Sequence, residues 1–124
     1  MELIKHLIDQ QEPSLHLVKV KSTGKLTAEE VRTSIYTVAK FCKETGAKKV
    51  FVDQLEALSF PSNAYGFNLG SDVAHLLKGV SIAIVHTWKV EDEIKFFEKV
   101  AQKRGGNMKV FSDVKSAKSW LETF

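Results

Sequence analysis

Three side chains of the sequence have the chemistry of a nucleophile, a base and an orienting acid: Ser62, His86 and Asp53. In a hydrolase such groups lie within hydrogen-bonding distance of one another, and the histidine takes the proton of the serine. The surrounding sequence does not favour that use, because no Gly-x-Ser-x-Gly elbow surrounds any serine. An aspartate at a strand end usually caps the following loop or helix. We therefore expect a protein that is not an enzyme, and we keep a hydrolase-like use of Asp53 and His86 as the third hypothesis.

The histidines and the cysteine are not spaced as metal ligands. His6, His16, His75 and His86 contain no pair four residues apart, and Cys42 has no cysteine or histidine at ligand spacing. No glycine-rich phosphate-binding or dinucleotide-binding motif occurs either. Cys42 lies on the apolar stripe of a predicted helix, where a buried, unreactive thiol is the usual state. The sequence thus predicts neither a metal nor an organic cofactor.

Composition and charge exclude several classes of protein. Of the 124 residues, 44% are hydrophobic and 27% are charged, which is typical of a globular domain. The net charge is +3, but the 18 Lys and Arg are interleaved with 15 acids and form no basic run with aromatics, so we expect no nucleic-acid partner. No stretch approaches the roughly 20 apolar residues that span a bilayer, and the first residues lack the pattern of a signal peptide. With a single cysteine, these features predict a cytoplasmic protein without a membrane span.

The pattern of apolar residues predicts alternating strands and helices. Two short runs, 50–52 and 82–85, are apolar without polar alternation, which is typical of strands buried on both faces. A capping box from Thr27 to Glu30 begins a helix that Gly46 ends. The expected elements, in chain order, are strands over 2–9 and 14–21 with a turn at 10–13 and an end at Gly24, the helix 27–46, a strand 49–53, a helix from about 65 to 77, a strand 81–86, a helix 91–104, a strand 108–111 and a helix that Ser112 or Asp113 caps.

This β-β-α-β-α-β-α-β-α order predicts an α/β fold. Residues 1–124 form a single domain around one mixed, mostly parallel central sheet of about five strands, with helices packed on it. In open parallel sheets, ligands bind beyond the carboxyl ends of the strands. We therefore expect three segments to converge there: 53–63, 86–89 and 112–113. Trp88 follows a strand end outside any helical stripe, and an exposed tryptophan can anchor a partner.

Several local features, in the right order, resemble the SpoIIAA-like, STAS-related domains in their small stand-alone form. The features are Gly24 to Glu30 before the first helix, Val50 to Asp53 followed by Phe60-Pro61, Lys95 to Glu98 running to Arg104-Gly105, and Val110 to Leu121. The resemblance covers almost the whole chain. It implies the SpoIIAA-like fold and a module without enzymatic activity.

The resemblance also implies classes of ligand. Some relatives bind a protein partner under control of serine or threonine phosphorylation, and some related folds hold lipids or other apolar ligands. Regulatory relatives carry an Asp-Ser-Ser/Thr-Gly-type segment at the start of a helix, where this chain has Ser59-Phe60-Pro61-Ser62-Asn63. Ser62 is the nearest hydroxyl in place and is the candidate phosphosite, although the motif around it is missing.

The first hypothesis is therefore a binding or regulatory module that engages a protein partner at the carboxyl ends of the strands. The second is a small carrier of lipid or another apolar ligand, with the loop from Leu55 to Tyr65 and the helix behind it as a lid. A homodimer is left open. The residues that we expect to bind the ligand or partner are Asp53, Phe60, Ser62, Tyr65, His86 and Trp88.

Overall fold

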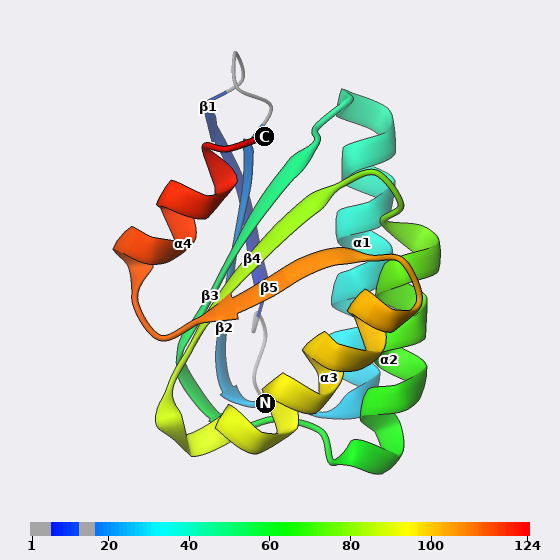
Figure 1. Ribbon diagram of the computed structural model, residues 1–124, viewed down its shortest axis with the longest axis vertical. Helices are drawn as coiled ribbons and strands as arrows, with labels where there is room; N and C mark the ends of the chain where they lie inside the picture. The colour runs from blue at the N-terminus through cyan, green and yellow to red at the C-terminus, as the bar shows by residue number, and fades with distance from the viewer. Residues whose placement is uncertain (1–5, 13–16) are drawn as a thin grey trace.

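A sheet of four parallel strands lies at the centre of the fold, and a further strand, β1, pairs antiparallel with its first edge (Figure 1). The structure is a computed structural model that describes residues 6–12 and 17–124. The elements are β1 (His6–Glu12), β2 (Leu17–Lys25), α1 (Ala28–Thr45), β3 (Lys49–Ser59), α2 (Asn63–Leu76), β4 (Ser81–His86), η2 (Trp88–Val90), α3 (Glu91–Lys103), β5 (Asn107–Phe111) and α4 (Val114–Leu121). No helix within these residues has the length and apolar character needed to cross a membrane.

The predicted α/β class and mostly parallel sheet are confirmed, but the first hairpin is shifted. β1 continues through positions 10–12, which were predicted as turn, and β2 continues through Gly24 to Lys25. Residues 2–5 of the first predicted strand, and 13–16 between the two strands, lie outside the described residues. Gly24 has φ of +78° where the pairing of β2 with β3 becomes irregular, so this glycine bends the strand rather than ending it.

The first helix begins and ends at the predicted residues. The Thr27 hydroxyl accepts a hydrogen bond from the backbone N–H of Glu30, and the Glu30 carboxylate accepts one from the backbone N–H of Thr27 at 3.1 Å. Gly46 takes the left-handed conformation and donates its N–H to the Cys42 carbonyl. Cys42 is buried as predicted, and burial raises the pKa of its thiol.

The strand β3 is twice as long as predicted. The prediction ended it at Asp53 and placed a loop from Leu55 to Asn63, whereas the strand runs to Ser59. Its second half stays in the sheet because it pairs with the end of β2, with Thr23 opposite Glu56 and a register shift before that pair. β4 stops opposite Gln54, so the segment 55–59 pairs with β2 on one side and has left β4 on the other. This segment is called the β3 extension below.

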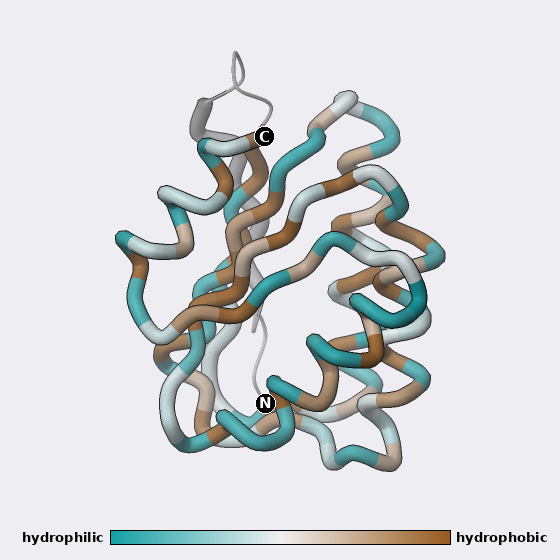
Figure 2. Tube along the Cα trace, in the orientation of Figure 1, coloured by the Kyte–Doolittle hydropathy of each residue, from teal (hydrophilic) through white to brown (hydrophobic). Residues whose placement is uncertain are grey.

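The helices are distributed unequally over the two faces of the sheet (Figure 1). α1, α2 and α3 cover one face, and the larger hydrophobic core lies between them and the sheet. α4 covers part of the other face, where a smaller cluster contains Phe51, Ala83, Val85, Ala117 and Leu121. The strands supply both cores because successive side chains point to opposite faces. Figure 2 shows the resulting hydrophobic band along the central strands.

The two glycines of α2 allow it to approach α3 closely. A Cβ atom on Gly70 would lie 2.9 Å from Cβ of Val100 and 3.0 Å from the Phe97 carbonyl oxygen. At Gly66 the nearest atom would be a ring carbon of Phe96, at 3.1 Å. The sequence indicates only that these glycines weaken the helix, and the structure gives the packing reason for them.

We expect Gly70→Ala to lower the free energy of unfolding by about 1–2 kcal/mol, because the overpacking exceeds the gain of roughly 1 kcal/mol in helix propensity. Urea unfolding followed by circular dichroism measures the difference. Gly66→Ala is the matched control: it makes the same gain in propensity and contacts a half-buried ring that can shift, so its effect should be smaller. Equal stability of Gly70→Ala and the parent chain would contradict the packing argument.

Candidate binding surface and internal cavity

The order of the strands decides which residues meet at the carboxyl ends. The order β1-β2-β3-β4-β5 follows the sequence, and the three crossover helices lie on one face. The described strands therefore contain no point where the order reverses, and the crevice that such a switch point opens is not formed. The predicted residues do not line one shared cleft: His86 and 112–113 line one, and Ser62 and Tyr65 line another. The carboxyl ends form a surface instead, with separate clefts on it.

Asp53 and His86 lie on opposite faces of the sheet. In the register of β3 and β4, Gln54 is opposite His86 and Asp53 is opposite Val85. Because side chains alternate, His86 shares the face of α1–α3 with Gln54, and Asp53 shares the face of α4 with Val85. Oδ1 of Asp53 accepts a hydrogen bond from Leu55 N–H at 3.0 Å, which is a local turn contact inside the strand. Asp53 is thus not at the strand end, and the nucleophile–base–acid arrangement is not assembled.

His86 and the segment 112–113 do meet, as predicted. They line an open cleft together with Glu91 and Lys95 of α3 and Ser116 of α4. His86 is buried, and its Nδ1 lies 3.1 Å from the Thr87 carbonyl oxygen. Within the described part of the chain, no three His, Cys, Asp or Glu side chains are grouped as metal ligands.

Ser62 and Tyr65 line a second cleft, with Thr27 and Arg32 of the α1 end opposite them. Ser62 is the N-cap residue of α2, but its side chain makes no capping hydrogen bond, and the residue is exposed. Tyr65 is 54% exposed. The two predicted residues therefore share one site, and it is a different one from the cleft of His86.

Trp88 is 80% exposed on η2, which contacts β3. The Thr87 hydroxyl accepts a hydrogen bond from Lys89 N–H at 2.9 Å and fixes the start of this turn. The β3 extension presents two more exposed apolar side chains, Leu55 at 42% and Leu58 at 56%. We call Leu55, Leu58 and Trp88 the apolar end surface. Sequence reasoning placed both leucines in a lid-like loop and did not predict them as exposed residues of a strand.

Phe60 does not belong to this surface. It is 7% exposed, and its ring centroid lies 5.3 Å from that of Phe97 in the main core. Phe60 therefore has almost no exposed surface for a partner contact, and its ring instead lines the internal cavity described next. The cause is the length of β3, because the short connection after Ser59 turns Phe60 inward under α3 instead of leaving it on a loop.

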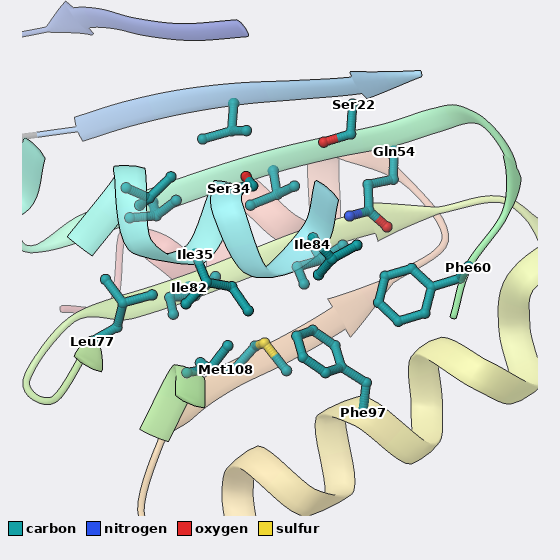
Figure 3. A pocket seen from close by; sticks show the side chains of 16 residues that line it. Ser22, Ser34, Ile35, Gln54, Phe60, Leu77, Ile82, Ile84, Phe97 and Met108 are labelled. Atoms are coloured by element: carbon teal, nitrogen blue, oxygen red, sulfur yellow. The ribbon is translucent and has the colours of Figure 1, made fainter. Parts of the chain in front are cut away.

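A cavity of about 50 Å³ lies in the main core next to Phe60, between the sheet and the helices (Figure 3). Its wall is apolar except at Ser22 of β2, Ser34 of α1 and Gln54 of β3. Gln54 is 5% exposed, and its Oε1 has no hydrogen-bond partner among the described residues. Sequence reasoning included Gln54 only as part of the segment 53–63 and not as a site residue, although it continues the inward-facing alternation of Val50 and Val52.

No protein-family model and no curated protein sequence matches the chain. Several solved structures are similar to it. The anti-sigma factor antagonist SpoIIAA in its unphosphorylated form aligns with a TM-score of 0.59 and 11% identity, over 96% of this chain and 99% of that one. The chain has the SpoIIAA-like fold. An uncharacterised DUF3478-family protein from Shewanella loihica PV-4, also with a SpoIIAA-like fold, aligns with a TM-score of 0.56 and 20% identity, over 98% of each chain.

The resemblance in fold that the sequence indicates is thereby confirmed. Within the SpoIIAA-like fold of this chain, the segment Ser59 to Asn63 spans the end of β3 and the start of α2. The hydroxyl that the resemblance singles out, that of Ser62, is thus at the exposed N-cap position of α2.

Asp113 caps the N-terminus of α4, and this cap makes the stability of the folded chain depend on pH. The Ser116 N–H donates to Oδ1 of Asp113 at 2.7 Å, and this hydrogen bond holds the pKa of the carboxyl below its ordinary value near 3.8. A lowered pKa adds stability above the unfolded-state value and loses it as pH falls through the folded-state value. We expect Asp113→Ala to lower Tm at neutral pH, and the difference from the parent chain to shrink in acid. Asp113→Asn keeps a cap without a titrating group, so a pH-dependent difference between Asp113→Asn and Asp113→Ala would contradict this.

The unpartnered oxygen of Gln54 should cost stability. A buried acceptor without a hydrogen bond is unfavourable by about 1–3 kcal/mol, so we expect Gln54→Met to raise the free energy of unfolding by about 1 kcal/mol. Gln102→Met is the matched control. The Gln102 side chain donates to the Met108 carbonyl at 2.8 Å, so the same exchange there should destabilise the chain. Urea unfolding of both variants measures the signs, and destabilisation by Gln54→Met would contradict the argument.

Proposed function

We propose that this chain is a regulatory binding module that engages a protein partner through the apolar end surface. The observation that carries the proposal is the exposure of Trp88, 80%, beside a strand whose end presents Leu55 and Leu58. Burying a tryptophan gives a large contact area at low cost in side-chain entropy, and such residues dominate the binding energy of interfaces. An enzymatic role has less support, because Asp53 and His86 point to opposite faces.

The fold supports a protein partner rather than another class of ligand. The similar structure of SpoIIAA is that of an anti-sigma factor antagonist, which is a protein defined by its action on another protein. At 11% identity the likeness supports the class of function and not the partner. A lipid carrier has less support, because the cavity of about 50 Å³ is far below the roughly 300–1,000 Å³ of pockets that enclose drug-sized ligands.

The other predicted site residues are assigned either to the rim of the interface or to its support. Tyr65 and Ser62 lie at the start of α2, at the same end of the molecule as the carboxyl ends of the strands (Figure 1). We assign both residues to the rim of the partner interface. Phosphorylation of the Ser62 hydroxyl would add negative charge to this rim. His86 and Asp53 support the surface from within the sheet, and neither is assigned a direct contact.

Trp88→Ala should weaken partner binding and leave the fold intact. A photo-crosslinking residue at position 58 captures the partner in cell extract, and the affinity of the purified pair is then measured. We expect Trp88→Ala to weaken binding by about thirtyfold, which corresponds to a hot-spot residue worth about 2 kcal/mol. Tm should stay constant, because the side chain is exposed.

The matched control is Tyr36→Ala, which removes an aromatic side chain of α1 that is 51% exposed and lies outside the apolar end surface. We expect it to leave the affinity unchanged. If both variants bind equally well, Trp88 is not an anchor and the proposed surface is wrong. If the captured partner is a second copy of this chain, the contact is a homodimer interface, and sedimentation of Trp88→Ala should then give the monomer.

A further inference from the structure

A buried hydrogen-bond acceptor without a partner in the described chain, Oε1 of Gln54, lies in the wall of the cavity in the main core. The Gln54 side chain is buried, with 5% of the residue exposed, and its Oε1 has no hydrogen-bond partner among the described residues. Buried polar atoms are nearly always hydrogen-bonded, since an unsatisfied one is costly. Figure 3 shows the amide projecting from β3 into the space beside Ile84 and Phe60. A group that enters this space and donates one hydrogen bond would therefore gain the full interaction with Oε1.

The rest of the wall defines the chemistry of such a group. The lining side chains are neutral, and those opposite the amide are apolar, among them Ile35, Phe97 and Met108. A charged ligand would lose its hydration without a counter-charge, so the site selects a neutral molecule. The body of the molecule has to be apolar, because most of the surface it would touch is hydrocarbon.

The volume limits the size of the ligand. At about 50 Å³, the cavity has about a third of the roughly 150 Å³ of an engineered cavity that binds benzene. It therefore admits a few non-hydrogen atoms. A water molecule needs two to four polar partners, and the wall contains three polar side chains, Ser22, Ser34 and Gln54, but a single water would fill only part of the cavity and leave the rest facing hydrocarbon. A hydroxyl with a short apolar body matches both the acceptor and the wall.

We propose that the cavity between the sheet and α1–α3 is a binding site for a small neutral molecule with a hydroxyl group and a short apolar body, and that Gln54 Oε1 accepts the hydrogen bond from this hydroxyl. The site is separate from the apolar end surface, because Gln54 faces the interior while Leu55, the next residue, is exposed. The proposal therefore stands or falls independently of the protein partner.

The test uses 2-propanol as the probe and the full chain labelled at its methyl groups. Resonances of Val20, Ile84 and Met108, which line the cavity, are followed by NMR during a titration. We expect saturable shifts at these methyl groups. Gln54→Met, which removes the acceptor at similar volume, should weaken the affinity at least tenfold. Asn68→Leu, which removes an exposed amide of α2 outside the cavity, should leave it unchanged.

Xenon binding shows whether a Gln54 variant loses affinity for 2-propanol because the acceptor is gone or because the cavity is filled or collapsed. It needs space and no hydrogen bond, so it should shift the same methyl groups in the parent chain and in Gln54→Ala, which leaves more room and no amide. Gln54→Ala should bind xenon and lose its affinity for 2-propanol. Shifts with 2-propanol that rise linearly without saturation, or equal affinities in the parent chain and both Gln54 variants, would overturn the proposal. A slowly exchanging water at Gln54 that 2-propanol does not displace would overturn it as well.

Discussion

The parallel pairing of β3 with β4 is the constraint on which the rest of the structure depends. It ends where Gln54 lies opposite His86, while β3 continues along β2 for five residues more, from Leu55 to Ser59. Up to that point the strand is enclosed by neighbours and helices, and beyond it the strand presents leucines to the solvent. The end of the pairing between β3 and β4 thus separates the buried amide of Gln54 from the exposed apolar end surface. η2, which carries Trp88, contacts β3.

The distribution of helices follows from the order of the strands. When successive parallel strands are added in one direction, crossovers of the usual hand place every connecting helix on the same face. α1, α2 and α3 accordingly form one layer, and its tight packing requires glycine at position 70. The opposite face receives α4 and a small separate cluster around Phe51. A ligand crevice of the kind found at a reversal of strand order has no place in this arrangement.

The sequence predicts the elements of this fold better than it predicts the site. Thr27, Gly46 and the apolar runs of β3 and β4 act locally, so their roles can be inferred from neighbouring residues alone. The continuation of β3 could not be predicted, because Asp53 to Glu56 have little strand propensity and are held there by pairing with β2. Three misplacements follow from that single error: Asp53 at a strand end, Phe60 on a loop, and the leucines of the extension in a lid.

The same error explains why the sequence does not identify Gln54 as an inward-facing site residue. A polar residue after a buried run signals the end of a strand in most sequences, whereas here it is an inward-facing member of the alternation. Only the register with β4 shows which face it occupies. The sequence places His86 and the segment 112–113 together correctly, because His86 ends β4 and the segment follows β5, and local sequence sets the ends of both strands.

The sequential order of the strands also has a kinetic consequence. Every ladder between the described strands joins strands that are neighbours along the chain, so none of these pairings spans more than one connection. The entropy of loop closure is then recovered step by step as each unit docks on the previous one. Folding rates rise as contacts become more local, so this topology favours rapid assembly for an α/β chain of its length. The last element in chain order, α4, covers its own small cluster, so its local opening would leave the principal core covered.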